Sequence, residues 1–241
     1  MIDAVDPFIG TDVTALPPPS GLAATWWWPK PQVGNTHPGA VAPFGMVSAC
    51  AYSGAYPTGY GVHDLNTEGV PTVLHDRLMA SGFTHFQQSG TGAIRKYYNY
   101  LRVTPMVEPL DALGTTWDLA DEAAEPGYYV TTLASGIRCE ITVGPKSAVH
   151  RYTFPDHEDA RLVIDLSLGG LAIDHGTTVP IRARVRTDTP HAAQGELVVE
   201  GAPLAFHVEC DAPDWQQMLL SLIHISEPTR LDARSRMPSS A

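Results

Sequence analysis

The chain has 241 residues and a formal net charge of -11; 44% of its residues are hydrophobic and 17% are charged. This length and composition fit one sizeable globular domain or two small ones. The negative charge excludes a nucleic-acid backbone as the expected partner and favours a neutral or cationic ligand. The three cysteines, Cys50, Cys139 and Cys210, are odd in number and far apart, so we expect buried free thiols rather than disulfides or a metal cluster.

The first 25 residues predict extended chain, because short apolar pieces are interrupted by Pro7, Gly10 and the prolines at 17–19. The start has no basic region followed by an apolar stretch, and no later stretch reaches about 18 uninterrupted apolar residues. We therefore expect no export signal or membrane span. As given, the chain is expected in the cytoplasm; with a truncated start it would be secreted or periplasmic.

Residues 26–28 are three consecutive tryptophans, followed by two prolines. Neighbouring side chains of an extended segment point to opposite sides, so the three rings cannot all face one core. At least one is expected at a surface, a pocket wall or an interface. Two interpretations stay open, namely an aromatic platform for a sugar or apolar ligand and a plug between domains.

Residues 33–46 read V-G-N-T-H-P-G-A-V-A-P-F-G-M and hold Asn35, Thr36 and His37 among three glycines and two prolines. The backbone must therefore turn repeatedly while presenting a few polar side chains. A loop stiffened by prolines loses less entropy on binding, so this pattern predicts a preorganised binding loop. A tight surface crossover fits the same composition.

Residues 49–68 are expected to form a loop with one short strand, and residues 70–80 a short helix. Residues 81–92 then place several hydrogen-bonding side chains between three glycines: His85, Gln87, Gln88, Ser89 and Thr91. Such side chains suit a ligand with many hydroxyl groups. A polar turn between two strands would have the same composition.

From residue 97 onward the sequence alternates with period two and is punctuated by turn residues, which is typical of antiparallel sheet. We expect strands at residues 98–103, 127–133, 137–143, 148–154, 161–168, 181–187, 196–200 and 204–210. The alternation of arginines at 182, 184 and 186 predicts one cationic, solvated strand face. Eight or more strands with almost no helix predict an all-β fold, an antiparallel β-sandwich.

No catalytic constellation is complete in the chain. Glycoside hydrolysis usually requires two facing carboxylates, and the candidates near polar segments are Asp64, Glu68, Asp76, Asp165 and Asp174. Asp165 lies inside V-I-D-L, where we expect a strand residue with a structural partner. The His-Asp pairs at 63–64 and 75–76 match no closed zinc site, and neither a G-x-S-x-G elbow nor a phosphate loop is present.

The last 22 residues resemble a translated sequencing adapter. Residues 220–230, L-S-L-I-H-I-S-E-P-T-R, fit the in-frame translation of a transposase-type adapter, and residues 234–241, R-S-R-M-P-S-S-A, fit the flow-cell tail that follows it. We therefore predict that the natural sequence ends near residue 219 and exclude 220–241 from fold reasoning as a non-native tail. A genuine C-terminal strand is the alternative.

Four segments together resemble glycoside hydrolase family 92, the calcium-dependent exo-acting α-mannosidases. They are V-D-P-F-I-G-T at 5–11, G-N-T-H-P-G-A-V-A-P-F-G-M at 34–46, G-F-T-H-F-Q-Q-S-G-T-G at 82–92, and G-I-R-C-E-I-T with H-R-Y-T-F-P within 136–155. They occur in the family's order, and the resemblance covers residues 1–219.

This resemblance implies an N-terminal β-sandwich domain that packs on an (α/α)6 barrel, with the active site between them. Family members invert configuration, and both catalytic carboxylates and most calcium ligands belong to the barrel, which this chain lacks. The chain is then expected to be inactive alone, to act on α-mannoside glycans with its barrel, and to bind neither nucleic acid nor membrane. Motif position suggests these substrate-binding residues: Gly34, Asn35, Thr36, His85, Ser89, Gly90 and Thr91.

The third segment departs from the common family pattern G-F-S-H-T-H-L-S-G-T-G, because Phe86, Gln87 and Gln88 replace T-H-L. The chain is also longer than usual between residues 60 and 82. Both departures bear on the linkage or aglycone that the pocket would prefer. Two rival functions stay open: a stand-alone carbohydrate-binding sandwich and a protein-interaction domain.

Overall fold

The computed structural model describes residues 5–12, 20–22, 34–55, 58–65, 71–87, 100–156, 159–166, 181–199 and 202–211. The chain divides into two compact units, unit 1 (Met1–Ile181) and unit 2 (Arg182–Ala241). The three tryptophans at 26–28 and the tail at 220–241 lie outside the described residues. The domain boundary at residue 219 and the adapter origin of the tail therefore stay predictions.

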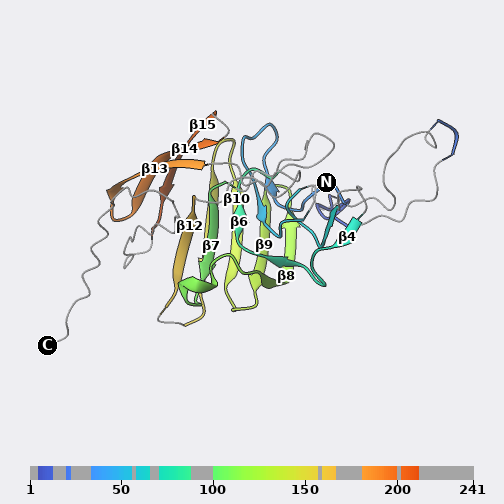
Figure 1. The fold of residues 1–241 in the computed structure, drawn as a ribbon, viewed down its shortest axis with the longest axis horizontal. Helices are drawn as coiled ribbons and strands as arrows, with labels where there is room; N and C mark the ends of the chain where they lie inside the picture. The colour runs from blue at the N-terminus through green and yellow to red at the C-terminus, as the bar shows by residue number, and fades with distance from the viewer. Residues whose placement is uncertain are drawn as a thin grey trace, which may run out of the picture. The chain divides into compact units, whose positions relative to one another are not determined.

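The described residues of unit 1 form two five-stranded antiparallel sheets and a separate two-stranded hairpin (Figure 1). The first sheet has the order β1 (Ala40–Val41), β2 (Ser48–Ala51), β6 (Phe83–Thr84), β7 (Arg102–Met106) and β12 (Arg161–Asp165). The second has the order β11 (Ala148–Thr153), β10 (Arg138–Val143), β9 (Tyr128–Leu133), β8 (Trp117–Glu125) and β5 (Met79–Ala80). The hairpin pairs β3 (His63–Leu65) with β4 (Pro71–Val73), and a short 3-10 helix spans Leu110–Ala112.

The second sheet follows the alternation of the sequence. In β10, Cys139 and Ile141 are buried while the residues between and beside them are less so, as period two requires. The turn between β9 and β10 contains Gly136 at φ +85°, a backbone conformation that glycine adopts without strain. The all-β prediction is confirmed, and seven of the eight predicted strands overlap β9 to β15.

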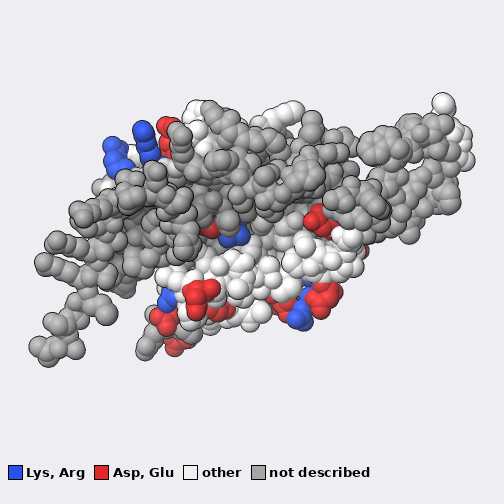
Figure 2. Space-filling model, in the orientation of Figure 1, with Lys and Arg blue, Asp and Glu red and all other residues white. Residues whose placement is uncertain are grey.

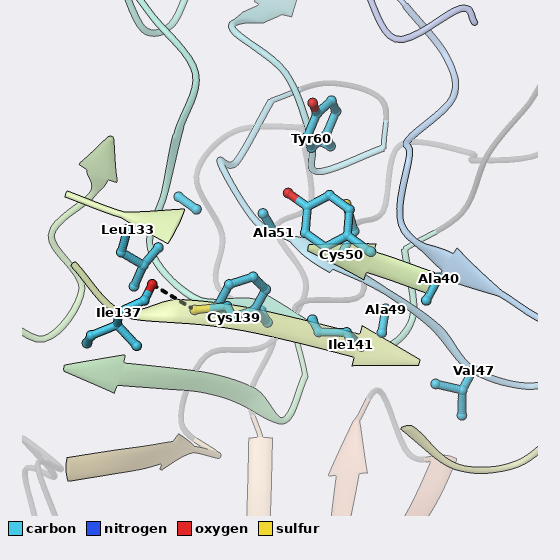
Figure 3. Close-up of a cluster of buried hydrophobic side chains, with 13 residues drawn as sticks. Ala40, Val47, Ala49, Cys50, Ala51, Tyr60, Leu133, Ile137, Cys139 and Ile141 are labelled. Carbon is cyan, nitrogen blue, oxygen red and sulfur yellow. Dashed lines mark hydrogen bonds between the residues drawn. The ribbon is translucent and has the colours of Figure 1, made fainter. Parts of the chain in front are cut away.

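The hydrophobic core of unit 1 lies between the two sheets (Figure 3). The first sheet and its adjoining segments contribute Ala40, Val47, Ala49, Cys50, Ala51, Tyr60 and Phe83; the second contributes Ala80, Tyr129, Leu133, Ile137, Cys139 and Ile141. The thiol of Cys139 donates to the carbonyl of Ile137 over 3.6 Å. Cys50 and Cys139 are the buried free thiols that the sequence predicts, whereas Cys210 is a free thiol that is only half-buried.

Unit 2 is a three-stranded antiparallel sheet with the order β13 (Ile181–Thr189), β14 (Ala192–Val199) and β15 (Ala202–Glu209). A Cβ at Gly195 would lie 2.2 Å from the carbonyl oxygen of Arg184, so this strand pair requires a glycine there. The side chains of Arg184 and Arg186 are exposed, in agreement with the predicted cationic strand face. Figure 2 shows basic side chains over this sheet, next to acidic ones.

One prediction of local structure is wrong and another is incomplete, because residues 49–68 contain parts of two strands, β2 and β3, where one was expected. The segment predicted as a helix over residues 70–80 instead forms β4 and β5, because each pairs with a strand elsewhere in the chain. The sequence also gave no indication of β8, which pairs with both β9 and β5. Among the described residues, no helix has the length and hydropathy needed to cross a membrane.

Candidate functional site

The segments at 5–12 and 34–36 are joined by hydrogen bonds. Gly10 adopts φ +82°, and its carbonyl accepts the amides of Asn35 and Thr36 at 3.0 and 3.2 Å. The Thr36 hydroxyl donates to the carbonyl of Ile9 over 2.7 Å. These bonds fix the backbone of Asn35, whose side chain is exposed.

Two glycines allow the 34–46 segment to approach its neighbours closely. A Cβ at Gly34 would lie 2.4 Å from the carbonyl carbon of Thr11, and one at Gly39 would lie 2.4 Å from the carbonyl oxygen of Ala49. Both distances are too short for a side chain. The predicted loop is therefore held against the 5–12 segment at one end and against β2 at the other.

His37 is buried between these contacts. Its Nδ1 accepts the amide of Gly39 at 3.2 Å, so the ring proton lies on Nε2, which donates to the Ser48 hydroxyl over 2.9 Å. Burial lowers the pKa of His37 to about 4, although a hydrogen bond to the Gln87 backbone raises it in part. The ring is therefore neutral at neutral pH and serves as an internal hydrogen-bonding group.

His85 follows β6 and is only 8% exposed. Its Nδ1 donates to the carbonyl of Leu101 over 3.0 Å, and its Nε2 lies 2.9 Å from Nε2 of His150. Nδ1 of His150 lies 2.6 Å from the hydroxyl of Tyr152. Burial lowers the pKa of His85 to about 4 and that of His150 well below its usual value. The third and fourth motif segments thus meet in a chain of buried polar groups.

Gln87 anchors the end of the 82–87 segment to β2. Its amide nitrogen donates to the carbonyls of Cys50 and Ala51 at 3.2 and 2.9 Å and to the Thr84 hydroxyl at 2.9 Å. Its carbonyl oxygen is buried without a hydrogen-bond partner among the described residues. The residue that replaces the common family histidine is therefore part of the buried framework at this site.

The segment around Tyr60 lies between the two groups of predicted site residues. A Cβ at Gly59 would be 3.6 Å from Cδ of Gln87, and one at Gly61 would be 3.8 Å from the carbonyl oxygen of Thr11. Asn35 and Thr36 lie together on Gly10, and Ser48, which bonds both His37 and the His85 carbonyl, connects His85 to the 34–46 segment. Ser89, Gly90 and Thr91 are outside the described residues, so their predicted role stays a prediction.

Sequence reasoning missed Glu122. A β-bulge in β8, with Asp121 at φ +50°, turns the Glu122 side chain inward, where the hydroxyls of Tyr60 and Tyr129 donate to its two oxygens. Burial raises the pKa of Glu122, and the two tyrosine hydrogen bonds lower it in part. An acidic residue within an alternating strand gives no signal of this inward turn.

The predicted carboxylates are dispersed. Asp165 forms a buried ion pair with Arg102 at 3.2 Å, which confirms the prediction of a structural partner. Asp64 lies on β3 and Asp76 is exposed, while Glu68 and Asp174 fall outside the described residues. Among the described residues, no group of three or more histidine, cysteine or acidic side chains could hold a metal ion.

Comparison with known proteins gives a family match, a similar sequence and a similar solved structure. The glycosyl hydrolase family 92 N-terminal domain matches residues 4–196. An uncharacterized secreted glycosidase from Arthroderma benhamiae is 31% identical over 136 residues, which make up 53% of this chain and 16% of that protein. A family GH92 inverting mannosidase from Bacteroides thetaiotaomicron shares the fold, with a TM-score of 0.54 and 16% identity over 89% of this chain and 30% of that one.

These matches agree with the antiparallel sheets and with the four motif segments; hydrogen bonds join the first segment to the second and the third to the fourth. The chain spans 16% of the glycosidase and 30% of the mannosidase, so it corresponds to a small part of each. Because the family match covers most of the sequence, the chain belongs to glycoside hydrolase family 92 and carries its N-terminal domain.

Proposed function

We propose that this chain is the N-terminal part of an inverting, calcium-dependent exo-α-mannosidase that hydrolyses α-mannosides of glycans. Its loops would form one wall of the sugar pocket, and its surface would dock a C-terminal barrel domain. Family membership and the shared fold of a solved inverting mannosidase support the proposal. So does the chain's coverage of only 30% of that mannosidase, which leaves room for a second domain.

The observation that carries the proposal is the fixed presentation of Asn35 and Thr36. Two hydrogen bonds to Gly10 and the close approach of Gly34 to Thr11 set this backbone, while the Asn35 side chain stays exposed. A carboxamide offers donors and an acceptor, which match the hydroxyl groups of a sugar. A preset backbone reduces the entropy lost on binding. Ser89, Gly90 and Thr91 would complete this wall together with the backbone at His85.

The catalytic acid and base are proposed to lie in the barrel domain. Inverting hydrolysis uses one carboxylic acid and one carboxylate on opposite faces of the scissile bond. Two buried carboxyl groups of this chain already have partners, since Asp165 pairs with Arg102 and Glu122 binds two tyrosine hydroxyls. Calcium ligands are likewise proposed outside the described residues, which offer no cluster for a metal. The chain alone would then be inactive.

The decisive experiment compares the 241-residue chain with the product of a gene that continues past residue 219. Both are assayed on α-linked mannobiosides with calcium, and proton NMR identifies the anomer of the released mannose. We expect the long protein to release mannose with inverted configuration and the chain alone to release none. If the long protein hydrolyses no α-mannoside, or retains configuration, the proposed activity is wrong.

The pocket assignment is tested in the same long protein. Asn35→Ala should raise KM or lower kcat, whereas Asp111→Ala, at an exposed position in the 3-10 helix, should leave both unchanged. Equal kinetics for the two variants would remove Asn35 from the site. Calorimetric titration of the chain alone with mannosides examines the rival function, because affinity well below millimolar would indicate a stand-alone carbohydrate-binding module.

A further inference from the structure

We propose that His85 is a positioning residue, which forms with His150 and Tyr152 a hydrogen-bonded chain of one defined proton order that links the two sheets of unit 1. The link meets the backbone at Leu101, whose carbonyl accepts from His85 Nδ1, and at Ser48, whose amide donates to the His85 carbonyl. His85 would thus shape the candidate site through backbone placement, with both ring nitrogens already engaged.

The proton order follows from the acceptor at one end. A carbonyl oxygen can only accept, so Nδ1 of His85 must carry the proton that it donates to Leu101 over 3.0 Å. In a neutral ring, Nε2 of His85 is then an acceptor, and the proton in the 2.9 Å contact belongs to Nε2 of His150. Nδ1 of His150 is therefore unprotonated and accepts the Tyr152 hydroxyl over 2.6 Å. The two histidines must have opposite tautomers.

The surroundings keep every member of the chain neutral. Burial lowers the pKa of both histidines and raises that of Tyr152, so neither imidazolium nor phenolate forms at neutral pH. The ring centroids of the two histidines are 4.9 Å apart, and a charge on one would repel a charge on the other. Neutrality leaves one proton arrangement that satisfies all three contacts.

The alternation of β11 explains why the fourth motif segment can form this link. His150 and Tyr152 are two residues apart on one strand, so their side chains point to the same face, toward the first sheet. Arg151, between them, is exposed. In H-R-Y-T-F-P the histidine and the tyrosine are two residues apart. On a strand this spacing puts both side chains on one face, where they can bond to each other.

His85 also makes hydrogen bonds to the backbone at two positions, Ser48 and Leu101. Its own carbonyl accepts the amide of Ser48 at 2.9 Å, and Ser48 in turn binds His37. Its Nδ1 holds the carbonyl of Leu101, which adopts φ +56°, a conformation that is unfavourable for leucine. The His85 imidazole therefore braces the strained Leu101 beside β7, while the His85 backbone carbonyl binds Ser48, the hydrogen-bond partner of His37.

The first test reads the tautomers directly from long-range proton-nitrogen NMR spectra of the 241-residue chain labelled with 15N-histidine. We expect His85 to carry its proton on Nδ1, and both His150 and His37 to carry theirs on Nε2. Protonation of His85 on Nε2, or a charged ring at neutral pH, would overturn the proposal. This measurement needs no substituted protein and does not depend on mannosidase activity.

The second test uses two substitutions that each keep one half of the link. In His150→Gln the amide nitrogen corresponds to Nε2 and can still donate to His85, whereas in His150→Asn the amide oxygen corresponds to Nδ1 and can still accept from Tyr152. The amide of Ser48 should exchange with solvent roughly tenfold faster in the Asn variant, while the Gln variant should stay near the wild-type rate. Equal exchange in the two variants would show that the His85 contact does not carry the positioning.

Discussion

Lowering the pH from about 8 to about 5 should destabilise unit 1, because His37, His85 and His150 stay neutral in the fold while they take up protons in the unfolded chain. Burial is the main cause, and it holds the pKa of His37 and of His85 at about 4. The pKa of His150 is also lowered well below its usual value, by burial and by the neighbouring His85. At neutral pH these rings are largely uncharged in both the folded and the unfolded state. Keeping them neutral then costs the folded state almost no stability.

The size of the effect follows from proton linkage. Between about pH 6.5 and pH 4 the unfolded state binds more protons than the native state, so stability falls as the pH falls. With an unfolded pKa of about 6.5 and a folded pKa of about 4, each histidine loses about 2 kcal/mol of stability by pH 5. His37 and His85 together account for about 4 kcal/mol, a large share of the 5–15 kcal/mol typical of domains.

Glu122 acts in the opposite direction. Its pKa is raised in the fold by burial, so its protonation favours the native state as the pH falls below the folded pKa. This contribution offsets part of the histidine effect. Because three buried histidines act against one carboxyl group, the net result should still be a decline between about pH 7 and pH 5.

Urea unfolding followed by far-ultraviolet circular dichroism at several pH values measures this decline. His85→Asn keeps a donor for the Leu101 carbonyl but removes one titrating ring, so the decline should become smaller by about 2 kcal/mol. His207→Asn, at an exposed histidine of unit 2, should leave it unchanged. A free energy of unfolding that is the same at both ends of the pH range, or a His85→Asn variant with the full wild-type decline, would refute the reasoning.

Three further substitutions test the packing and the strained positions through urea unfolding. Gly82→Ala should lower the free energy of unfolding by more than about 2 kcal/mol, since a Cβ there would lie 2.6 Å from a threonine hydroxyl of β7. The control is Gly114→Ala, which also has a positive φ but no atom within 4 Å and should cost only about 1 kcal/mol. Similar losses in the two variants would contradict the predicted clash at Gly82. Phe44→Asn should stabilise by up to about 1 kcal/mol, because Phe44 is fully exposed at φ +57°, and Met46→Asn is the exposed control that should show no gain. Glu122→Gln should cost roughly 1–3 kcal/mol, because an amide cannot accept both tyrosine hydroxyls as a carboxylate does, and an unchanged stability would argue against those bonds.

The sequence allowed the all-β fold and most strands of its second half to be predicted, because β9 to β11 alternate clearly and are joined by short turns. The same reasoning failed where pairing partners are distant. β5 is two residues long and depends on β8, which is itself rich in alanine and acidic residues that have low strand propensity. Tertiary pairing, not local preference, makes these segments strands.

The candidate site was predictable only in part. Asn35 and Thr36 were found from the glycine and proline pattern around them, and the structure shows what holds their backbone. The partner of His85 could not be found in this way, because His150 is 65 residues distant and its neighbours give only the alternation of a strand. The inward turn of Glu122 depends on a bulge that no sequence periodicity predicts.

The strained residues help to explain why these contacts belong together. Leu101 and Asp121 both adopt left-handed backbone conformations, which natural chains maintain where the surrounding structure determines them strongly. At Leu101 the His85 ring supplies that constraint through the carbonyl; at Asp121 the bulge is held by the bonds between Glu122 and two core tyrosines. In each case a buried polar contact offsets the local strain. The contact at Leu101 also fixes a motif segment, and the contact next to Asp121 also fixes the core. We therefore expect loss of either contact to affect the 34–46 and 82–87 segments before it affects the backbone of β9 to β11, which is also held by regular strand pairing along its length.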